Sequence, residues 1–374
     1  MSDSVSNRVR AGLPTKGRGA VSNRTGRFER FTSEAIDDGW RDLNGLVPDE
    51  DEPPKLRTTV MRDTSRTVIT RNNSPDVGFD RSINPYRGCE HGCIYCYARP
   101  SHAYLGHSPG LDFETKLYGK FDAVERLKAE FAAPGYTPEP IMISGITDCY
   151  QPVERQLRIT RSIIEVLVEH RHPFTLITKN ALIARDADLL GAAAKLNLVS
   201  AALSVTTLDP ALARVMEPRA STPKKRLAAI KALSEAGVPM RVMVAPIIPG
   251  LTDPEIESIL EAVRDAGATG AGFVMLRMPH EIKELFAEWL TEHFADRAQH
   301  VLSLMRQVRG GKLYDSQWFS RQRGTGAYAE LIQHRFALAV KKLGLNRERR
   351  DLRRDLFRPP APSPKGDARQ MSLL

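Results

Sequence analysis

Three of the four cysteines in this 374-residue chain stand within one short stretch, Asn84 to Tyr97. They have the spacing C-x3-C-x2-C and are Cys89, Cys93 and Cys96. Gly88 and Gly92 stand where the backbone has to turn sharply to bring three sulfurs toward one centre. Three thiolates on one loop are a typical ligand set for a metal, so we expect the chain to fold around a metal centre.

Two kinds of metal centre fit these residues. Three cysteines and His91 would form a Cys3His zinc site. A cubane iron–sulfur cluster held by three cysteines would instead leave one iron without a protein ligand. Zinc ligands usually come as two separated pairs, so the compact spacing favours the cluster without excluding zinc. We expect no disulfides, because cysteines are few and no secretory signal is recognisable.

The cysteine loop resembles that of the radical S-adenosylmethionine superfamily, since an aromatic residue, Tyr95, directly precedes the last cysteine. The resemblance implies a 4Fe-4S cluster whose open iron binds S-adenosylmethionine. Reductive cleavage of that cofactor then gives a 5'-deoxyadenosyl radical, which abstracts a hydrogen atom from a substrate. More narrowly, the loop resembles the branch that includes spore photoproduct lyase. The resemblance also implies a reductant such as flavodoxin or ferredoxin as a partner.

Composition restricts the remaining possibilities. The chain is 41% hydrophobic and 26% charged, and it has no run of about 18 apolar residues that would suggest a membrane span. We therefore expect a cytoplasmic protein with no membrane partner. The net charge of +9 raises the question of an anionic partner.

The positive charge is concentrated near the two ends. Residues 1–30 carry seven basic and two acidic side chains, and residues 341–359 carry eight basic and three acidic ones. Such tails can bind nucleic acid through phosphate contacts, although flexible basic tails are often only solubilising. The tail cations considered are Arg8, Arg10, Lys16, Arg18, Arg24, Arg27, Arg30, Arg347, Arg349, Arg350, Arg353 and Arg354.

Apolar strands and amphipathic helices alternate through the middle of the chain, which predicts parallel strands with crossover helices. The expected strands are Ser82 to Pro85, Ile141 to Ser144, Phe174 to Thr178, Val199 to Val205, Met240 to Pro246 and Gly272 to Leu276. The expected helices between them are Phe121 to Ala132, Glu154 to His170, Arg185 to Lys195, Pro223 to Ala236 and Pro254 to Ala266. Short strands are also expected around Val60 and Val68.

This alternation of strands and helices predicts an α/β fold. The resemblance to the family implies that the strands and helices form a partial (βα)6 TIM-like barrel. We divide the chain into a flexible basic N-terminal arm (1–56, with a short helix over 32–46), a barrel (57–278, cysteine loop 84–97), a helical C-terminal extension (279–358) and a disordered tail (359–374). The extension should contain helices Glu281 to Phe294, Ala295 to Arg306 and Gly326 to Lys342.

The functional residues of a parallel barrel lie at the carboxyl ends of its strands. By resemblance, the turn after the second strand contacts the methionine end of the cofactor, although the usual acidic residue is absent. That turn contributes Ser144, Gly145 and Thr147. Lys179 would contact the methionine carboxylate and Ser204 a ribose hydroxyl or the methionine. Each of these residues could also be an ordinary polar residue at a strand end.

Cys149, the fourth cysteine, follows the second strand, and its thiol could return a hydrogen atom to a substrate radical. Spore photoproduct lyases carry a hydrogen-donating cysteine on this segment, but in our alignment that cysteine falls at Gly145. A buried structural thiol is the alternative for Cys149. Two further functions stay open: a DNA-lesion lyase of the photoproduct type, and a zinc- or cluster-bearing nucleic-acid-binding protein without radical chemistry. The aromatic and arginine-rich stretch from Leu313 to Gly326 fits base stacking, but also packing over a barrel mouth.

Overall fold

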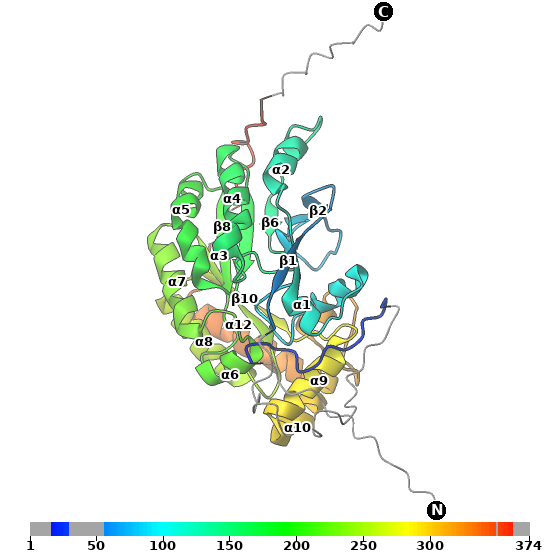
Figure 1. Cartoon of the computed structure of the whole chain (residues 1–374). Coiled ribbons are helices and arrows are strands. Elements are labelled where there is room, and N and C mark those ends of the chain that lie inside the picture. The colour runs from blue at the N-terminus through cyan, green and yellow to red at the C-terminus, as the bar shows by residue number, and fades with distance from the viewer. Residues whose placement is uncertain (1–15, 30–55, 349–350, 362–374) are drawn as a thin grey trace, which may run out of the picture.

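Seven strands form one large sheet whose order is β10-β9-β8-β7-β6-β3-β2 (Figure 1). The computed structural model describes residues 16–29, 56–348 and 351–361. The strands are β2 (Ile69–Arg71), β3 (Arg81–Ile83), β6 (Ile141–Ile143), β7 (Phe174–Thr178), β8 (Val199–Ser204), β9 (Met240–Ile247) and β10 (Gly270–Met275). All six strands expected for the parallel sheet are present, so this part of the prediction is confirmed.

The strands β3, β6, β7, β8, β9 and β10 pair in parallel, each with the next one in this series. β2 adds an antiparallel strand at the β3 edge. Within the described residues, β2 and β10 are the two edges of an open sheet and do not pair with each other. The carboxyl ends of all six parallel strands therefore lie along one side of the sheet.

Helices cross between the strands, as the alternating pattern predicts. They are α2 (Ala123–Phe131), α3 (Glu154–Leu157), α4 (Ile159–Glu169), α5 (Ala187–Lys195), α6 (Pro210–Met216), α7 (Pro223–Glu235) and α8 (Ile256–Asp265), with short 3-10 helices η3 (Ala181–Asp186) and η4 (Asp253–Glu255). Figure 1 shows α4, α5, α7 and α8 side by side along the sheet. Their apolar positions recur at helical spacing, so each helix buries one stripe against the strands.

The predicted helix from Glu154 to His170 is in fact two helices. Arg158 adopts a left-handed backbone conformation, φ 53°, between α3 and α4. The fully buried carboxylate of Glu154 accepts hydrogen bonds from the amides of Thr160 (3.0 Å) and Arg161 (3.3 Å). These amides belong to the first turn of α4 and have no partner inside the helix, so Glu154 stabilises a new helix start there.

A smaller sheet lies beside the cysteine loop. It has the order β1-β5-β4, with β1 (Thr59–Arg62) parallel to β5 (Lys116–Gly119) and β4 (Tyr86–Arg87) antiparallel to it. The 3-10 helix η2 (Arg99–Leu105) and α1 (Leu111–Thr115) connect the loop to β5. This sheet places the loop beside the carboxyl end of β3.

The helices of the C-terminal extension are α9 (Ile282–His293), α10 (Ala295–Gln307), α11 (Ser320–Arg323) and α12 (Ala327–Leu343). The three long helices lie where the sequence predicts them. α12 packs on α8, where the Arg335 guanidinium donates to Glu257 at 2.6 and 2.9 Å. None of the described helices is long and apolar enough to cross a membrane.

Residues 16–29, assigned above to a flexible arm, pack against the body: Ala20 and Val21 are buried. The predicted helix over 32–46 lies outside the described residues, as does most of the tail after 359. The aromatic stretch before α12 packs back onto the body. Its Arg321 side chain pairs with Asp76 in the loop between β2 and β3, with Nε 2.6 Å from Oδ2.

We predict that Glu154→Ala lowers the free energy of unfolding by about 3–5 kcal/mol, because it leaves the buried Tyr86 hydroxyl and two helix amides without their acceptor. Arg185 loses one of its two carboxylate partners and keeps Asp186. Chemical denaturation of the apoprotein measures this change. Glu235→Ala is the matched control, since Glu235 and its partner Lys231 are both about two-thirds exposed. That variant should change stability by less than about 1 kcal/mol. Equal effects in both variants would contradict the role of Glu154.

Candidate metal centre

The cysteine loop turns through two left-handed glycines, Gly88 (φ +74°) and Gly92 (φ +68°). A Cβ on Gly88 would lie 2.8 Å from the Leu117 side chain, and one on Gly92 would lie 2.7 Å from the Glu114 carboxylate. Both positions therefore require glycine for conformation and for space. The turns expected from the sequence are present.

Arg99 holds the loop from inside the protein. Its guanidinium is fully buried and donates to the carbonyls of Cys93 (2.9 Å) and Gly92 (3.1 Å), and also to those of Pro109 and Gly110. The same guanidinium lies 2.5 Å from the Glu114 carboxylate, which is also fully buried. The ion pair therefore fixes the backbone on which the cysteines stand.

Glu114 also binds the N-terminal segment. Its two carboxylate oxygens accept hydrogen bonds from the amides of Gly19 (3.0 Å) and Ala20 (2.9 Å). This contact lays the segment across the loop so closely that a Cβ on Gly19 would stand 1.7 Å from the Gly92 carbonyl oxygen. The cysteine loop is thus held between Arg99 and a segment about 70 residues away in the sequence.

All four cysteines are free thiols. Cys89 and Cys93 are buried and Cys96 is half-buried. Burial raises the pKa of the Cys89 thiol, and the charges of Asp148 and the neighbouring cysteines raise it further. Burial likewise raises the pKa of Cys93. Because a thiol must lose its proton to bind iron, metal binding here should release protons.

The zinc alternative fits this arrangement less well. In the described part of the chain, no three His, Cys, Asp or Glu side chains converge closely enough to hold one metal ion. Cubane thiolates bind different irons, so they need not converge in that way. His91, the expected fourth zinc ligand, instead lies with Nε2 3.2 Å from the Asn180 amide nitrogen and Nδ1 3.4 Å from Asp148. The donor set therefore fits a cluster.

Asp148 anchors the loop to the ends of β6 and β7. It accepts hydrogen bonds from the Thr178 hydroxyl (2.6 Å) and from the amides of Lys179 and Tyr150. Burial alone would raise the pKa of Asp148, but the charge of His91 and these donors lower it to about 2. The carboxylate is therefore ionised at neutral pH and holds His91 beside the thiols.

The turn after β6 is tightly bent and bonded to the cysteine loop. Ser144 has a left-handed backbone, φ 76°, and its hydroxyl donates to the Thr147 carbonyl. The Gly145 carbonyl accepts the Tyr97 hydroxyl at 2.6 Å, and the Thr147 hydroxyl donates to the Tyr86 carbonyl. These contacts tie the turn to the cysteine loop. The structure thus brings the turn residues named above to the loop.

Two further predicted residues also lie near the loop. The Lys179 ammonium stands 5.7 Å from the centroid of the Tyr95 ring. Tyr95 is buried, and its hydroxyl donates to Glu217. Ser204 is buried at the end of β8, where its carbonyl accepts from Arg226 at 2.9 Å. Lys179 and Tyr95 thus lie together, whereas Ser204 makes structural contacts with Arg226 and with β9.

Cys149 is fully buried, with Sγ 3.8 Å from the Ile177 carbonyl oxygen. It packs in the hydrophobic core, and burial raises the pKa of its thiol. These observations favour a structural thiol over a hydrogen donor.

Four residues that the sequence does not single out also build the centre: Arg99, Glu114, Glu217 and Arg226. They are buried and charged, and each contacts its partner across a loop or helix. Arg99 follows the last cysteine by three residues, which is a weak signal of loop support. For the others we find no sequence signal, since their partners are identified only by the fold.

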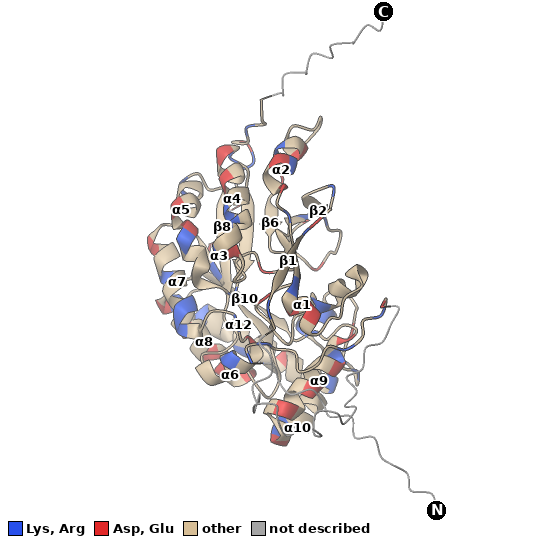
Figure 2. Ribbon diagram, in the orientation of Figure 1, with Lys and Arg blue, Asp and Glu red and all other residues tan. Residues whose placement is uncertain are grey.

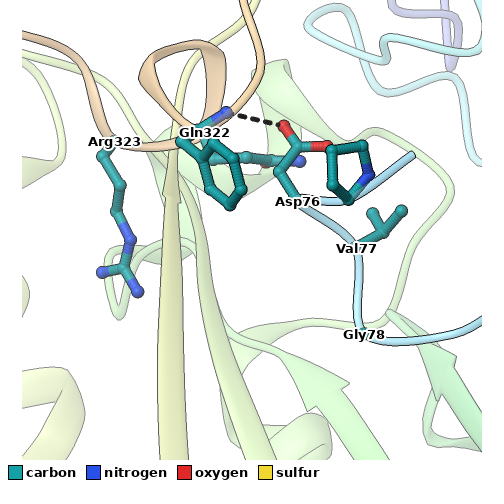
Figure 3. Close-up of a pocket in the computed structure, with 7 residues that line it drawn as sticks. Asp76, Val77, Gly78, Gln322 and Arg323 are labelled. Atoms are coloured by element: carbon teal, nitrogen blue, oxygen red, sulfur yellow. Dashed lines mark hydrogen bonds between the residues drawn. The ribbon is translucent and has the colours of Figure 1, made fainter.

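A shallow pocket of about 290 Å³ lies between the loop after β2 and α11. Figure 3 shows Asp76, Val77 and Gly78 on one side of it and Gln322 and Arg323 on the other. Its lining contains none of the predicted site residues. The pocket therefore offers no direct evidence about the metal centre.

The structure thus combines an open, mainly parallel α/β sheet with a three-cysteine loop after its first parallel strand. The radical SAM superfamily model matches residues 83–263. An uncharacterized protein of Mycobacterium tuberculosis is 34% identical over 275 residues, which are 73% of this chain and 77% of that protein. An uncharacterized protein of Methanocaldococcus jannaschii is 28% identical over 173 residues, 46% of this chain and 62% of the relative.

Among solved structures, spore photoproduct lyase complexed with dinucleoside spore photoproduct matches with a TM-score of 0.51 and 15% identity. The match covers 76% of this chain and 80% of the lyase. At this identity the likeness shows the fold. The chain belongs to the radical S-adenosylmethionine superfamily, whose members normally bind a 4Fe-4S cluster and S-adenosylmethionine.

We predict that Gly19→Ala lifts the N-terminal segment from the cysteine loop, because the new methyl group would overlap the Gly92 carbonyl oxygen. The Ala20 amide should then lose its bond to Glu114 and exchange its hydrogen faster. Stability should fall by about 1–3 kcal/mol. Hydrogen exchange followed by mass spectrometry measures the change. Gly78→Ala is the control, since nothing lies within 4 Å of its Cβ position; unchanged protection in Gly19→Ala would refute the contact.

Proposed function

We propose that this protein is a cytoplasmic radical S-adenosylmethionine enzyme that abstracts a hydrogen atom from a substrate yet to be identified. The observation that carries the proposal is the trio of free, clustered thiols beside the carboxyl ends of the parallel strands. Reduced thiols are typical of the cytoplasm. When bound, the 4Fe-4S cluster and its cofactor supply the 5'-deoxyadenosyl radical; the protein holds and shields them.

In this proposal Cys89, Cys93 and Cys96 would hold the cluster and leave one coordination position open for the cofactor. Lys179 supplies a positive charge for the methionine carboxylate. The turn formed by Ser144, Gly145 and Thr147 borders the methionine end, and Tyr95 and Ser204 border the rest of the cofactor. The open sheet forms a partial (βα)6 TIM-like barrel around this site.

The type of reaction is a separate part of the proposal. The structural likeness to spore photoproduct lyase suggests a lyase, with a photoproduct-type DNA lesion as one candidate substrate. Cys149 is buried, and glycine stands where the alignment expects the donor cysteine of that lyase. We therefore favour hydrogen-atom abstraction from another substrate over the photolesion reaction.

A low-potential reductant such as flavodoxin or ferredoxin is the partner that this chemistry requires. Binding of nucleic acid through the tails has weaker support. Among the described tail cations, Arg24 pairs with Glu288, Arg27 with Glu281 and Arg354 with Glu139. Figure 2 shows basic and acidic side chains interspersed over the described part of the chain. Much of the described tail charge is thus balanced within the molecule.

The metal content tests the first half of the proposal. Protein purified and reconstituted without oxygen should bind about four irons and four sulfides per chain and absorb at about 400 nm. Cys93→Ala should lose this absorbance, because it removes one of the three ligands. Cys149→Ala is the matched control and should retain the cluster. One tightly bound zinc in place of iron would contradict the proposal.

Cofactor cleavage tests the second half. With a strong reductant, the reconstituted protein should release 5'-deoxyadenosine from S-adenosylmethionine even without substrate. Lys179→Ala should weaken cofactor binding by roughly tenfold or more while iron content stays normal, because it removes one charge–carboxylate contact. Lys231→Ala, an exposed lysine on α7, is the control. Normal cofactor affinity in Lys179→Ala would remove this residue from the site.

A further inference from the structure

A buried carboxylate, that of Glu217, lies against the cysteine loop. Its exposure is 2%. One of its oxygens accepts hydrogen bonds from the Tyr95 hydroxyl and from the Thr206 hydroxyl (2.8 Å), and the other accepts from the Arg226 guanidinium. Burying an ionised group costs free energy unless an opposite charge compensates it. The presence of the Glu217 carboxylate at this position therefore calls for an explanation.

The turn that carries Glu217 is joined to the loop through the backbone. The Ile94 amide donates to the Met216 carbonyl at 3.1 Å, and the Arg219 amide donates to the His91 carbonyl at 3.2 Å. Glu217 therefore follows directly after a residue bonded to the centre of the cysteine loop. The backbone of Glu217 is thereby fixed beside the loop, and the three side-chain donors named above hold its carboxylate.

Two cations oppose this carboxylate. Arg226 is buried, and it also donates to the carbonyls of Ser204 and Ser221. Glu217 binds the hydroxyl of Tyr95 and pairs with Arg226, while Lys179 lies over the ring of the same tyrosine. The three charges therefore surround Tyr95, which directly precedes the ligand Cys96.

We propose that Glu217 is a positioning residue that, through its charge, lowers the reduction potential of the cluster held beside it, against the opposing charges of Arg226 and Lys179. The inference rests on the proposed function only in that it requires a cluster at Cys89, Cys93 and Cys96. It goes further by assigning a role to a buried ion pair that is not a metal ligand.

The direction follows from electrostatics. Reduction adds one electron, so a nearby negative charge disfavours it and a nearby positive charge favours it. The interior screens charges weakly, so one buried charge close to the cluster has a large effect. Glu217 stabilises the oxidised cluster and so lowers its reduction potential. Arg226 and Lys179 limit this decrease, which keeps the potential within reach of a biological reductant.

The test is a redox titration of the reconstituted protein without S-adenosylmethionine or substrate, followed by electron paramagnetic resonance. Glu217→Gln keeps the size of the side chain and an oxygen for the Tyr95 and Thr206 hydroxyls, but removes the charge. We expect it to favour cluster reduction by about tenfold, a rise of about 59 mV for a one-electron couple. Glu217→Asp retains the charge and should restore most of the wild-type value.

Two further variants separate charge from structure. Thr206→Val removes a hydrogen bond to the same carboxylate without changing charge, and it should leave the potential near the wild-type value. Lys179→Met removes a cation from a half-buried position and should shift the potential downward. A purely structural disturbance would not shift the potential in opposite directions for Glu217→Gln and Lys179→Met.

The outcomes remain interpretable if one variant misfolds. If Glu217→Gln does not fold with Arg226 unpaired, the downward shift in Lys179→Met and the unchanged potential in Thr206→Val still test the idea. A wild-type protein that binds no cluster would defeat the proposed function itself. A normal cluster whose reduction potential in both Glu217→Gln and Lys179→Met equals the wild-type value would overturn this inference alone.

Discussion

The ion pair between Arg99 and Glu114 is the contact on which the metal centre depends. Arg99 donates to the carbonyls of the cysteine loop, and Glu114 accepts the amides of Gly19 and Ala20 on its other side. One pair of fully buried charges therefore joins the loop and the N-terminal segment. A buried pair of this kind is a poor source of net stability, but it penalises every arrangement that separates its partners. It thereby holds the three thiols in place before any metal binds.

Two further carboxylates near the centre are also compensated by cationic side chains or hydrogen-bond donors. Asp148 is compensated by His91 and hydroxyl and amide donors, and Glu217 by Arg226. Both carboxylates lie within contact of the loop or of its Tyr95 side chain. The centre is therefore a set of thiols surrounded by neutralised pairs, which suits a group whose own charge changes when an electron arrives. The described tail arginines follow a similar rule at the surface, where acidic partners occupy several of them.

The sequence predicts the fold well where the information is local. Alternating apolar strands and amphipathic helices locate all six parallel strands, and the three cysteines with Gly88 and Gly92 locate the centre. The break at Arg158 is missed because it depends on Glu154 reaching back to the first amides of α4. Glu114 and Glu217 are missed because the residues that join them to the N-terminal segment and to the cysteine loop, Gly19 and Tyr95, are distant in the chain. A single carboxylate also has no periodicity. The N-terminal packing is missed because a Gly- and Arg-rich segment has the composition of a flexible arm.

The central claim is that the three cysteines leave one iron open and that S-adenosylmethionine binds it. Electron–nuclear double resonance on the reduced, reconstituted protein tests this most directly, with cofactor labelled isotopically at the amino nitrogen or the carboxylate oxygens. The account predicts a strong hyperfine coupling from both labels to the cluster, because both groups would chelate the same iron. A reduced cluster that shows no coupling to either label in the presence of saturating cofactor would contradict it.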